Sequence, residues 1–292
     1  MTEVGDAIAR GLVALARRQR DDGSFPLLTG TRRQGWRPSS GLFSTAYVLL
    51  GAGRLLPPAR IARAVAFVRA QRRADGLWEF DPALGLPPDS DSTSCALAAL
   101  ALHEGSAEPA DAELLRGFWR PPEGPFRTWR AAGPWADPAR DDPVVNCNLV
   151  LALDLLRQPA TPVEREAVAG LLRRSTSGSR YYCAPAAIAH AAARAGFPAS
   201  ALPDVAAAPP AAGGARARAP RGGGGGRPGR RGGAAHPPAQ RPDGAWPGGP
   251  WVFGVGTPYW GSSAVTTAFA IEALARHAGA APWTAGPAVA MK

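Results

Sequence analysis

The feature that most constrains this chain is a repeated pair of segments, one apolar on a single face and one apolar on all sides. In each copy, apolar residues three or four apart predict a helix with one buried face, and a longer apolar run predicts a fully buried helix after it. A glycine turn separates the two, and successive turn glycines are 53, 48, 54 and 66 residues apart, at Gly23, Gly76, Gly124, Gly178 and Gly244. Repeats of this length predict stacked helical hairpins.

Five such hairpins, with a partial sixth over 282–292, favour an all-α fold, an α/α toroid of about five to six hairpins. The inner helices would be buried and the outer helices amphipathic. We expect repeats one to four over 1–202 and the final repeat over 242–292. Between them, 203–241 is a Pro/Gly/Arg-rich low-complexity insertion that lacks the pattern of an outer helix, so we expect it to be disordered. The alternative is a local reading-frame shift in a GC-rich gene.

The net charge of +10 is concentrated in that insertion, which carries seven arginines and a single Asp204. It has no aromatic residue on which bases could stack, so no specific nucleic-acid partner is expected, although binding through the Arg/Gly segment is a weaker alternative. The three cysteines are widely spaced and predict neither disulfides nor a metal site. The sequence shows no signal peptide and no membrane-spanning run, which favours a cytoplasmic protein and leaves peripheral membrane contact open.

The short motif Asp89-Ser-Asp91-Ser-Thr93 stands directly before the buried run that ends at Leu102. Asp and Ser at a helix start are typical caps, because their oxygens accept from free backbone N–H groups. In stacked hairpins, however, all inner helices start at one end, so polar residues at their starts converge on one mouth. The motif is therefore either a helix cap or an acid site.

The segment from Arg63 to Trp78, with Gln71, Gly76 and Trp78, resembles the Gln-Trp repeat of the terpene cyclase and prenyltransferase superfamily. Within that superfamily, the motif at 89–93 resembles the Asp-x-Asp-Asp motif of class II cyclases such as squalene-hopene and bacterial diterpene cyclases. The resemblance implies a protonation-initiated cyclisation of an isoprenoid, either a prenyl diphosphate or a squalene-type polyene. Such an enzyme is an isomerase, that is an intramolecular cyclase, or a lyase, and the resemblance implies that Asp91 is the acid and Asp89 its supporting carboxylate.

Further residues would complete such a site. We expect support for Asp91 from the polar residues Asn146, Asn148, Ser92 and Thr93. Cavity walls that stabilise a cation would come from the aromatic residues Tyr181, Trp260, Phe253 and Trp129. A diphosphate would be held by Arg32, Arg33 and Arg37. No cofactor or metal ligand set is recognised, and Mg²⁺ would enter only with a diphosphate substrate.

Two departures from the family pattern keep alternatives open. Ser92 replaces the last acid of the motif, and the chain has one toroid where class II cyclases pair two helical domains. A second helical-domain protein is therefore an expected partner if the toroid's own cavity does not suffice. The alternative function is a non-catalytic toroid that binds a lipid or a partner protein, with both Asp residues acting as caps.

Overall fold

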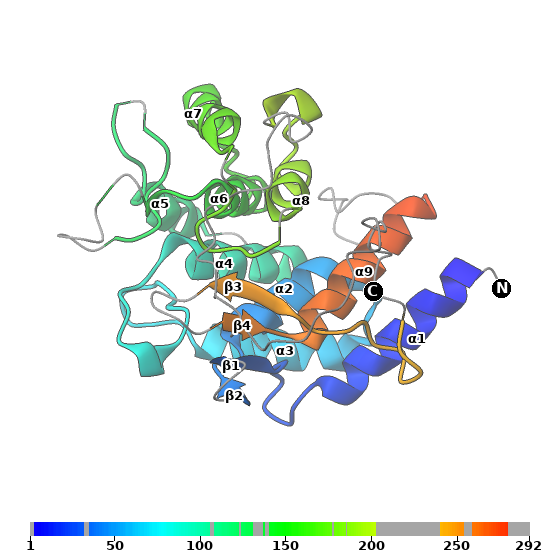
Figure 1. Ribbon diagram of the computed structural model, residues 1–292. Helices are drawn as coiled ribbons and strands as arrows, with labels where there is room; N and C mark the ends of the chain where they lie inside the picture. Colours follow the sequence, from blue (N-terminus) through cyan, green and yellow to red (C-terminus); the bar gives the residue numbers. More distant parts are fainter. Residues whose placement is uncertain are drawn as a thin grey trace, which may run out of the picture.

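The computed structural model describes residues 3–31, 35–105, 108–122, 124–130, 137, 140–176, 178–184, 186–202, 240–253 and 259–279. This part of the chain is mostly helical, with one small sheet (Figure 1). The α-helices are α1 (Glu3–Arg18), α2 (Leu42–Ala52), α3 (Pro58–Ala70), α4 (Ser90–Glu104), α5 (Pro109–Arg116), α6 (Pro143–Leu155), α7 (Pro162–Arg174), α8 (Ala187–Arg194) and α9 (Ser263–His277). Short 3₁₀ helices are η1 (Gly53–Leu55), η2 (Pro82–Leu84) and η5 (Ala199–Ala201), and the strands are β1 (Leu27–Thr31), β2 (Gly35–Ser39), β3 (Pro250–Phe253) and β4 (Tyr259–Gly261).

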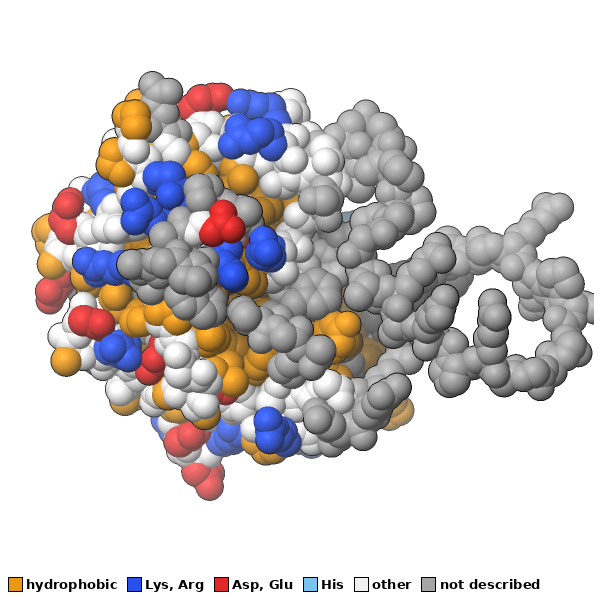
Figure 2. Space-filling model, turned by 60° about the vertical axis from the view of Figure 1, so that its left-hand side comes forward, with side chains coloured by type: hydrophobic (Ala, Val, Ile, Leu, Met, Phe, Trp, Pro, Cys, Tyr) orange, Lys and Arg blue, Asp and Glu red, His pale blue; other side chains and the backbone are white. Residues whose placement is uncertain are grey.

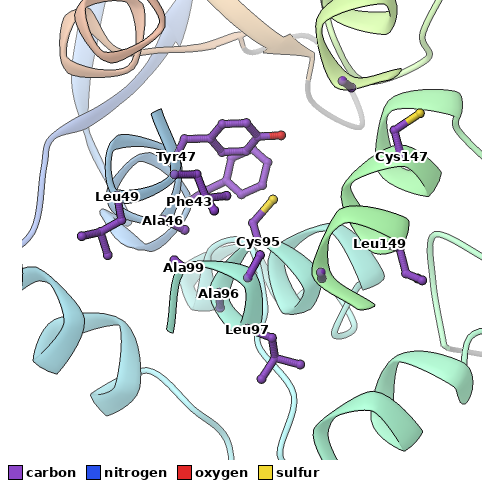
Figure 3. Close-up of a cluster of buried hydrophobic side chains, with 14 of the residues drawn as sticks. Phe43, Ala46, Tyr47, Leu49, Cys95, Ala96, Leu97, Ala99, Cys147 and Leu149 are labelled. Carbon is purple, nitrogen blue, oxygen red and sulfur yellow. The ribbon is translucent and has the colours of Figure 1, made fainter. Parts of the chain in front are cut away.

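The helices form the two layers that the repeat predicts. All residues of α2 are buried, and so is α4 from Ser90 to Ala101. The inner helix α4 packs against α2 and α6, while α2 also contacts α9 and α6 also contacts α8. The half-exposed helices α1, α3, α5 and α7 pack on the outside of this series. Figure 3 shows Tyr47 of α2 and Cys95 of α4 pointing into the space between α2, α4 and α6.

The all-α prediction missed a four-stranded antiparallel sheet with the order β2-β1-β4-β3, which Figure 1 shows from β2 at the bottom to β3 at the top. Its strands come from the interhelical loops of the first and last repeats, so β1 pairs with β4 across most of the chain, with Thr29 opposite Trp260. The strands are three to five residues long. Such short segments, interrupted by glycine and proline, give no clear alternation in the sequence.

The turns between outer and inner helices are braced in the same way in four repeats. The backbone N–H of the aromatic residue two positions after the turn glycine donates to a side-chain oxygen in the first turns of the inner helix. These bonds run from Phe25 to Thr45 (2.8 Å), from Trp78 to Thr93 (3.2 Å), from Phe126 to Asn146 (2.8 Å) and from Trp246 to Thr267 (3.0 Å). The repeated glycine–aromatic signal therefore has a shared structural role.

The first and the last of these braced turns also pack on a neighbouring outer helix. The side-chain amide of Gln19 donates to the carbonyl of Arg60 in α3 at 2.9 Å. In the last repeat, Gln240 donates in the same way to the carbonyl of Ala7 in α1 at 2.8 Å. The last repeat therefore contacts the first as the first contacts the second.

Two predicted segments lie outside the described residues, namely almost all of the insertion, 203–239, and the partial sixth repeat over 282–292. The domain boundaries at 202 and 242 stay predictions. Among the helices that the structure describes, none is both long and apolar enough to cross a membrane.

Candidate active site

A pocket opens at the end of the molecule where α2, α4 and α6 begin. The space between its walls is about 480 Å³, which includes open solvent at the mouth. Two carboxyl groups, two hydroxyl-bearing side chains and otherwise apolar or aromatic side chains line it: Phe43, Phe80, Leu84, Leu86, Asp89, Asp91, Thr128, Trp129, Val145, Tyr181, Val252 and Trp260. The sheet contributes Val252 and Trp260, so the unpredicted strands form part of one wall.

Asp89 is the N-cap of α4. Its Oδ1 accepts from the backbone N–H of Ser92 at 2.7 Å, and its backbone pairs with Trp129. The cap interpretation of the motif therefore holds for this residue. The second oxygen, Oδ2, is buried and accepts no hydrogen bond within the described part of the chain.

Asp91 makes different contacts, since its carboxyl group caps nothing. Its Oδ2 accepts from the hydroxyl of Tyr182 at 2.5 Å, and its Oδ1 accepts from Nδ2 of Asn148 at 2.9 Å. The thiol of Cys95 lies 3.8 Å from Oδ1. Asp91 is 8% exposed and belongs to the pocket wall.

Both carboxyl groups titrate well above their ordinary range. Burial, followed by the neighbouring Asp89 carboxyl, raises the pKa of Asp91 to about 7, although the bonds from Tyr182 and Asn148 act in the opposite direction. Burial raises the pKa of Asp89 to about 6, against the bond from Ser92. A buried pair of acids thus favours the neutral form of each.

The segment that carries Tyr182 is held by the cap of the neighbouring inner helix. Asp142 caps α6 through Oδ1, and its Oδ2 accepts from the Ser179 hydroxyl and the Arg180 backbone N–H, both at 2.7 Å. On the other side, the backbone of Tyr182 bridges to Val252 of β3. The phenol is thereby fixed between α6 and the sheet.

The predicted supporting residues separate into two groups. Asn148 contacts Asp91, whereas Asn146 and Thr93 brace the backbone of Phe126 and Trp78 instead. Ser92 gives its backbone N–H to Asp89, and its hydroxyl is buried without a partner in the described ranges. Of these four, only Asn148 and the backbone of Ser92 therefore touch the acid pair.

Three of the predicted cavity aromatics, Tyr181, Trp129 and Trp260, line the pocket. The side chain of Phe253 lies outside what the structure describes. The sequence interpretation missed Phe43 and Phe80, which extend the aromatic wall from Trp260 inwards with centroid separations of 5.3 Å and then 5.2 Å.

Tyr47 and Tyr182 were also missed as neighbours of the acid. A comparison of the repeats could have found Tyr47. It lies two residues after the turn-bracing Thr45, as Asn148 lies two after Asn146 and Cys95 two after Thr93.

The predicted diphosphate grip is only partly described. Arg37 is exposed on β2, while Arg32 and Arg33 lie outside the described residues. Among the residues with described positions, no group of three or more His, Cys, Asp and Glu side chains is arranged to hold a metal ion.

Comparison with known proteins finds similarity in structure. No protein-family model matches the chain, and no curated protein matches it. Among solved structures, the type II terpene cyclase MstE from Scytonema, without ligand, superposes with a TM-score of 0.59 at 16% identity, over 96% of this chain and 100% of that chain. A variant of MstE in complex with geranylgeranyl dihydroxybenzoate, its substrate, gives a TM-score of 0.60 at 16% identity, over 95% and 98% of the two chains. The chain therefore has a class II terpene cyclase-like fold.

Proposed function

We propose that the chain is a class II terpene cyclase-like enzyme in which Asp91 protonates an isoprenoid and so starts its cyclisation. The observation that carries this proposal is the position of Asp91, a buried carboxyl group with a raised pKa in the wall of an aromatic pocket. A carboxyl group must be neutral to protonate an alkene, and a pKa near 7 leaves a large share of it neutral at physiological pH.

In the proposed reaction, the O–H bond of Asp91 breaks as a C–H bond forms at one alkene carbon. This leaves a carboxylate and a carbocation, which internal alkenes attack to close rings. Loss of a proton from the final cation makes the overall reaction an isomerisation. The faces of Phe43, Phe80 and Trp260 supply the negative ring surfaces that stabilise a cation, and the apolar wall limits access of water to it.

The proposed substrate is an isoprenoid whose apolar end occupies this pocket, either a prenyl diphosphate or a squalene-type polyene. The described lining supports this choice because its only charged groups are the two carboxyls, and MstE binds a geranylgeranyl compound. A diphosphate would lie outside the described lining, where Arg32, Arg33 and Arg37 are the proposed grip. A second helical-domain partner stays a prediction.

We also propose that the hairpins close into a toroid. A series of contacts runs from α9 through α2, α4 and α6 to α8. From α8, the side chains of His190 and Arg194 lie 3.4 Å and 3.6 Å from Glu272 of α9. In the outer layer, the hydrogen bond from Gln240 to the carbonyl of Ala7 likewise joins the last repeat to α1 of the first.

The test is product analysis by gas chromatography and mass spectrometry. Purified full-length protein is incubated with farnesyl diphosphate, geranylgeranyl diphosphate and squalene, beside Asp91→Asn and the control Asp154→Asn, whose carboxylate pairs with Arg165 outside the pocket. We expect a cyclic product that falls by about 10² or more in Asp91→Asn and persists in the control.

Two results would contradict the proposal. A variant with Asn at position 91 that still cyclises would place the acid elsewhere. A folded wild-type protein that binds these isoprenoids without converting them would favour the non-catalytic binding toroid.

A further inference from the structure

Four side chains from four parts of the chain, Asp91 included, form a closed circuit of hydrogen bonds at the proposed acid. Asn148 Nδ2 donates to Asp91 and, at 2.6 Å, to the hydroxyl of Tyr47. The hydroxyl of Tyr47 lies 2.9 Å from that of Tyr182, which donates to Asp91. All four residues are buried. Each hydrogen bond is therefore electrostatically stronger, because the local dielectric is low, and is shielded from exchange with water.

The number of hydrogens sets the direction of this circuit. An amide nitrogen carries two hydrogens and a phenol one. The two amide hydrogens of Asn148 serve Asp91 and Tyr47, its two shorter contacts, while the hydroxyl of Tyr182 lies farther from the same nitrogen, at 3.4 Å. Since the single hydrogen of Tyr182 points to Asp91, the hydrogen between the two phenols must come from Tyr47. Every bond of the circuit therefore runs towards Asp91, which is its final acceptor.

This direction has a consequence for the acid proton. Within the described ranges, every hydrogen bond of the Asp91 carboxyl group is one that it accepts. When the neutral group still accepts these bonds, its own proton is not used in a contact with the described protein, and the carboxyl group lines the pocket. The circuit leaves the proton available to a ligand.

We propose that Tyr182, Tyr47 and Asn148 are positioning residues that direct the Asp91 proton into the pocket and stabilise the carboxylate left after its transfer. This inference rests on the proposed function. Two donors on the product carboxylate make the acid stronger at the moment of transfer, while burial beside Asp89 keeps it neutral beforehand. A tyrosine pair coupled to the acid is thus a second, separate requirement of the site.

The other groups that act on this titration come from every neighbouring element. They are Asp89 and Cys95 of α4, Tyr47 of α2, Asp142 at the start of α6, Tyr182 of the 178–184 segment, and Arg194 of α8, whose guanidinium carbon lies 6.0 Å from the Tyr47 ring centroid. Each of them is present in all variants proposed below except where it is itself replaced.

The experiment measures the protonation of Asp91 directly. The carbonyl stretch of its neutral carboxyl group is isolated as the infrared difference between wild type and Asp91→Asn, and is followed from pH 5 to pH 9. In Tyr182→Phe, we expect the midpoint to rise by about one to two pH units, because a donor to the carboxylate is lost. In Tyr47→Phe, which only weakens that donor, a smaller rise is expected.

Tyr181→Phe is the matched control. Its hydroxyl accepts from Trp129 at 2.9 Å and makes no bond to Asp91, so the midpoint should not move. Replacing Tyr182 by 3-fluorotyrosine keeps the shape but gives a stronger donor, and the midpoint should then fall. This opposite sign separates a hydrogen-bonding role from packing, even if the phenylalanine variant folds poorly.

An unchanged midpoint in Tyr182→Phe, or equal shifts in Tyr182→Phe and Tyr181→Phe, would overturn the inference. The titration requires no turnover, so a protein that cyclises nothing would refute the proposed function and leave this test intact. In an active protein, the alkaline limb of the rate against pH should move with the infrared midpoint in every variant.

Discussion

Asp89 and Asp91 stand two residues apart in the sequence, yet their carboxyl groups meet different partners. Asp89 points back to the start of α4 and accepts from the helix backbone, while Asp91 points to side chains of other elements. The spacing of two residues at a helix start explains the difference, because only the residue before the first turn can cap it. The cap thereby holds a second negative charge close to the acid.

A prediction at the residue scale concerns how the free energy of unfolding changes with pH. The pKa of Asp91 is raised to about 7 in the folded protein, so between about pH 4 and pH 7 the folded state keeps a proton that the unfolded state loses. The stability from this group is present at low pH and is lost as pH rises through 7, by on the order of 1.4 kcal/mol for each unit between the two pKa values.

Asp91→Asn removes this titration. We therefore expect the variant to gain stability over the wild type as pH rises from 4 to 8, as measured by urea unfolding at each pH. Parallel curves for the two proteins over this range would mean that Asp91 is not held neutral by the fold.

The sequence identifies part of the candidate site for a physical reason. Asp91 and Asn148 could be proposed because they lie at the starts of buried runs, and the repeat brings those starts together. Tyr182 could not be assigned to Asp91, because α8 begins at Ala187 and the tyrosine lies in the irregular segment before it. Its position depends on Asp142 and on β3, which the repeat does not predict.

At the scale of elements, the turns between the helix layers depend on glycine for two separable reasons. Gly23 has φ +90°, and a Cβ there would lie 2.2 Å from the carbonyl oxygen of Arg63 in α3. Gly178 has nearly the same φ, +92°, but a Cβ there would meet nothing within 4 Å. The first turn is thus constrained by both conformation and contact, and the fourth by conformation alone.

Alanine substitutions at Gly23 and Gly178 separate the effect of conformation from the effect of contact. Gly178→Ala should cost roughly 1 kcal/mol of stability, from the positive φ alone. Gly23→Ala should cost about 1–3 kcal/mol more, because α3 must also move away from the new methyl group. Thermal or urea unfolding of the two variants measures the difference, and equal losses would show that the turn does not pack on α3 as described.

The sequence predicts helices and misses strands for the same reason. The pattern of a helix is local, and it is visible in the apolar runs of α2, which is buried throughout, and of α4, which is buried from Ser90 to Ala101. The strand pairing of Thr29 with Trp260 has no local signal. It depends on contact between the first and the last repeat, and this contact follows only from how all the hairpins stack.

At the scale of the whole molecule, the last repeat is held by many contacts besides its covalent link to 1–202. Gln240 bonds to α1, Asp243 forms an ion pair with Arg18 at 2.7 Å, and β4 pairs with β1. Figure 1 shows α9 lying along α1, which the contacts between these helices confirm. On the face shown in Figure 2, Lys and Arg side chains are interspersed with Asp and Glu side chains.

We therefore predict that 1–202 and 240–292, expressed as two polypeptides in one cell, form a complex that purifies through a tag on either piece. Without the covalent linker, the two polypeptides lose more entropy when they associate. The contacts of the last repeat would offset this loss. A piece 240–292 that is degraded, or that does not co-purify, would show that covalent attachment is needed.

The pairing of β1 with β4 also determines when this protein can fold. A ribosome releases α1 and β1 first, yet their partners α9 and β4 begin more than 200 residues later. The apolar face of α1 and the free edge of β1 must therefore wait, exposed, until β4 and α9 have been synthesised. Translation speed and chaperone supply, rather than final stability, would then limit the yield of active protein in a foreign host.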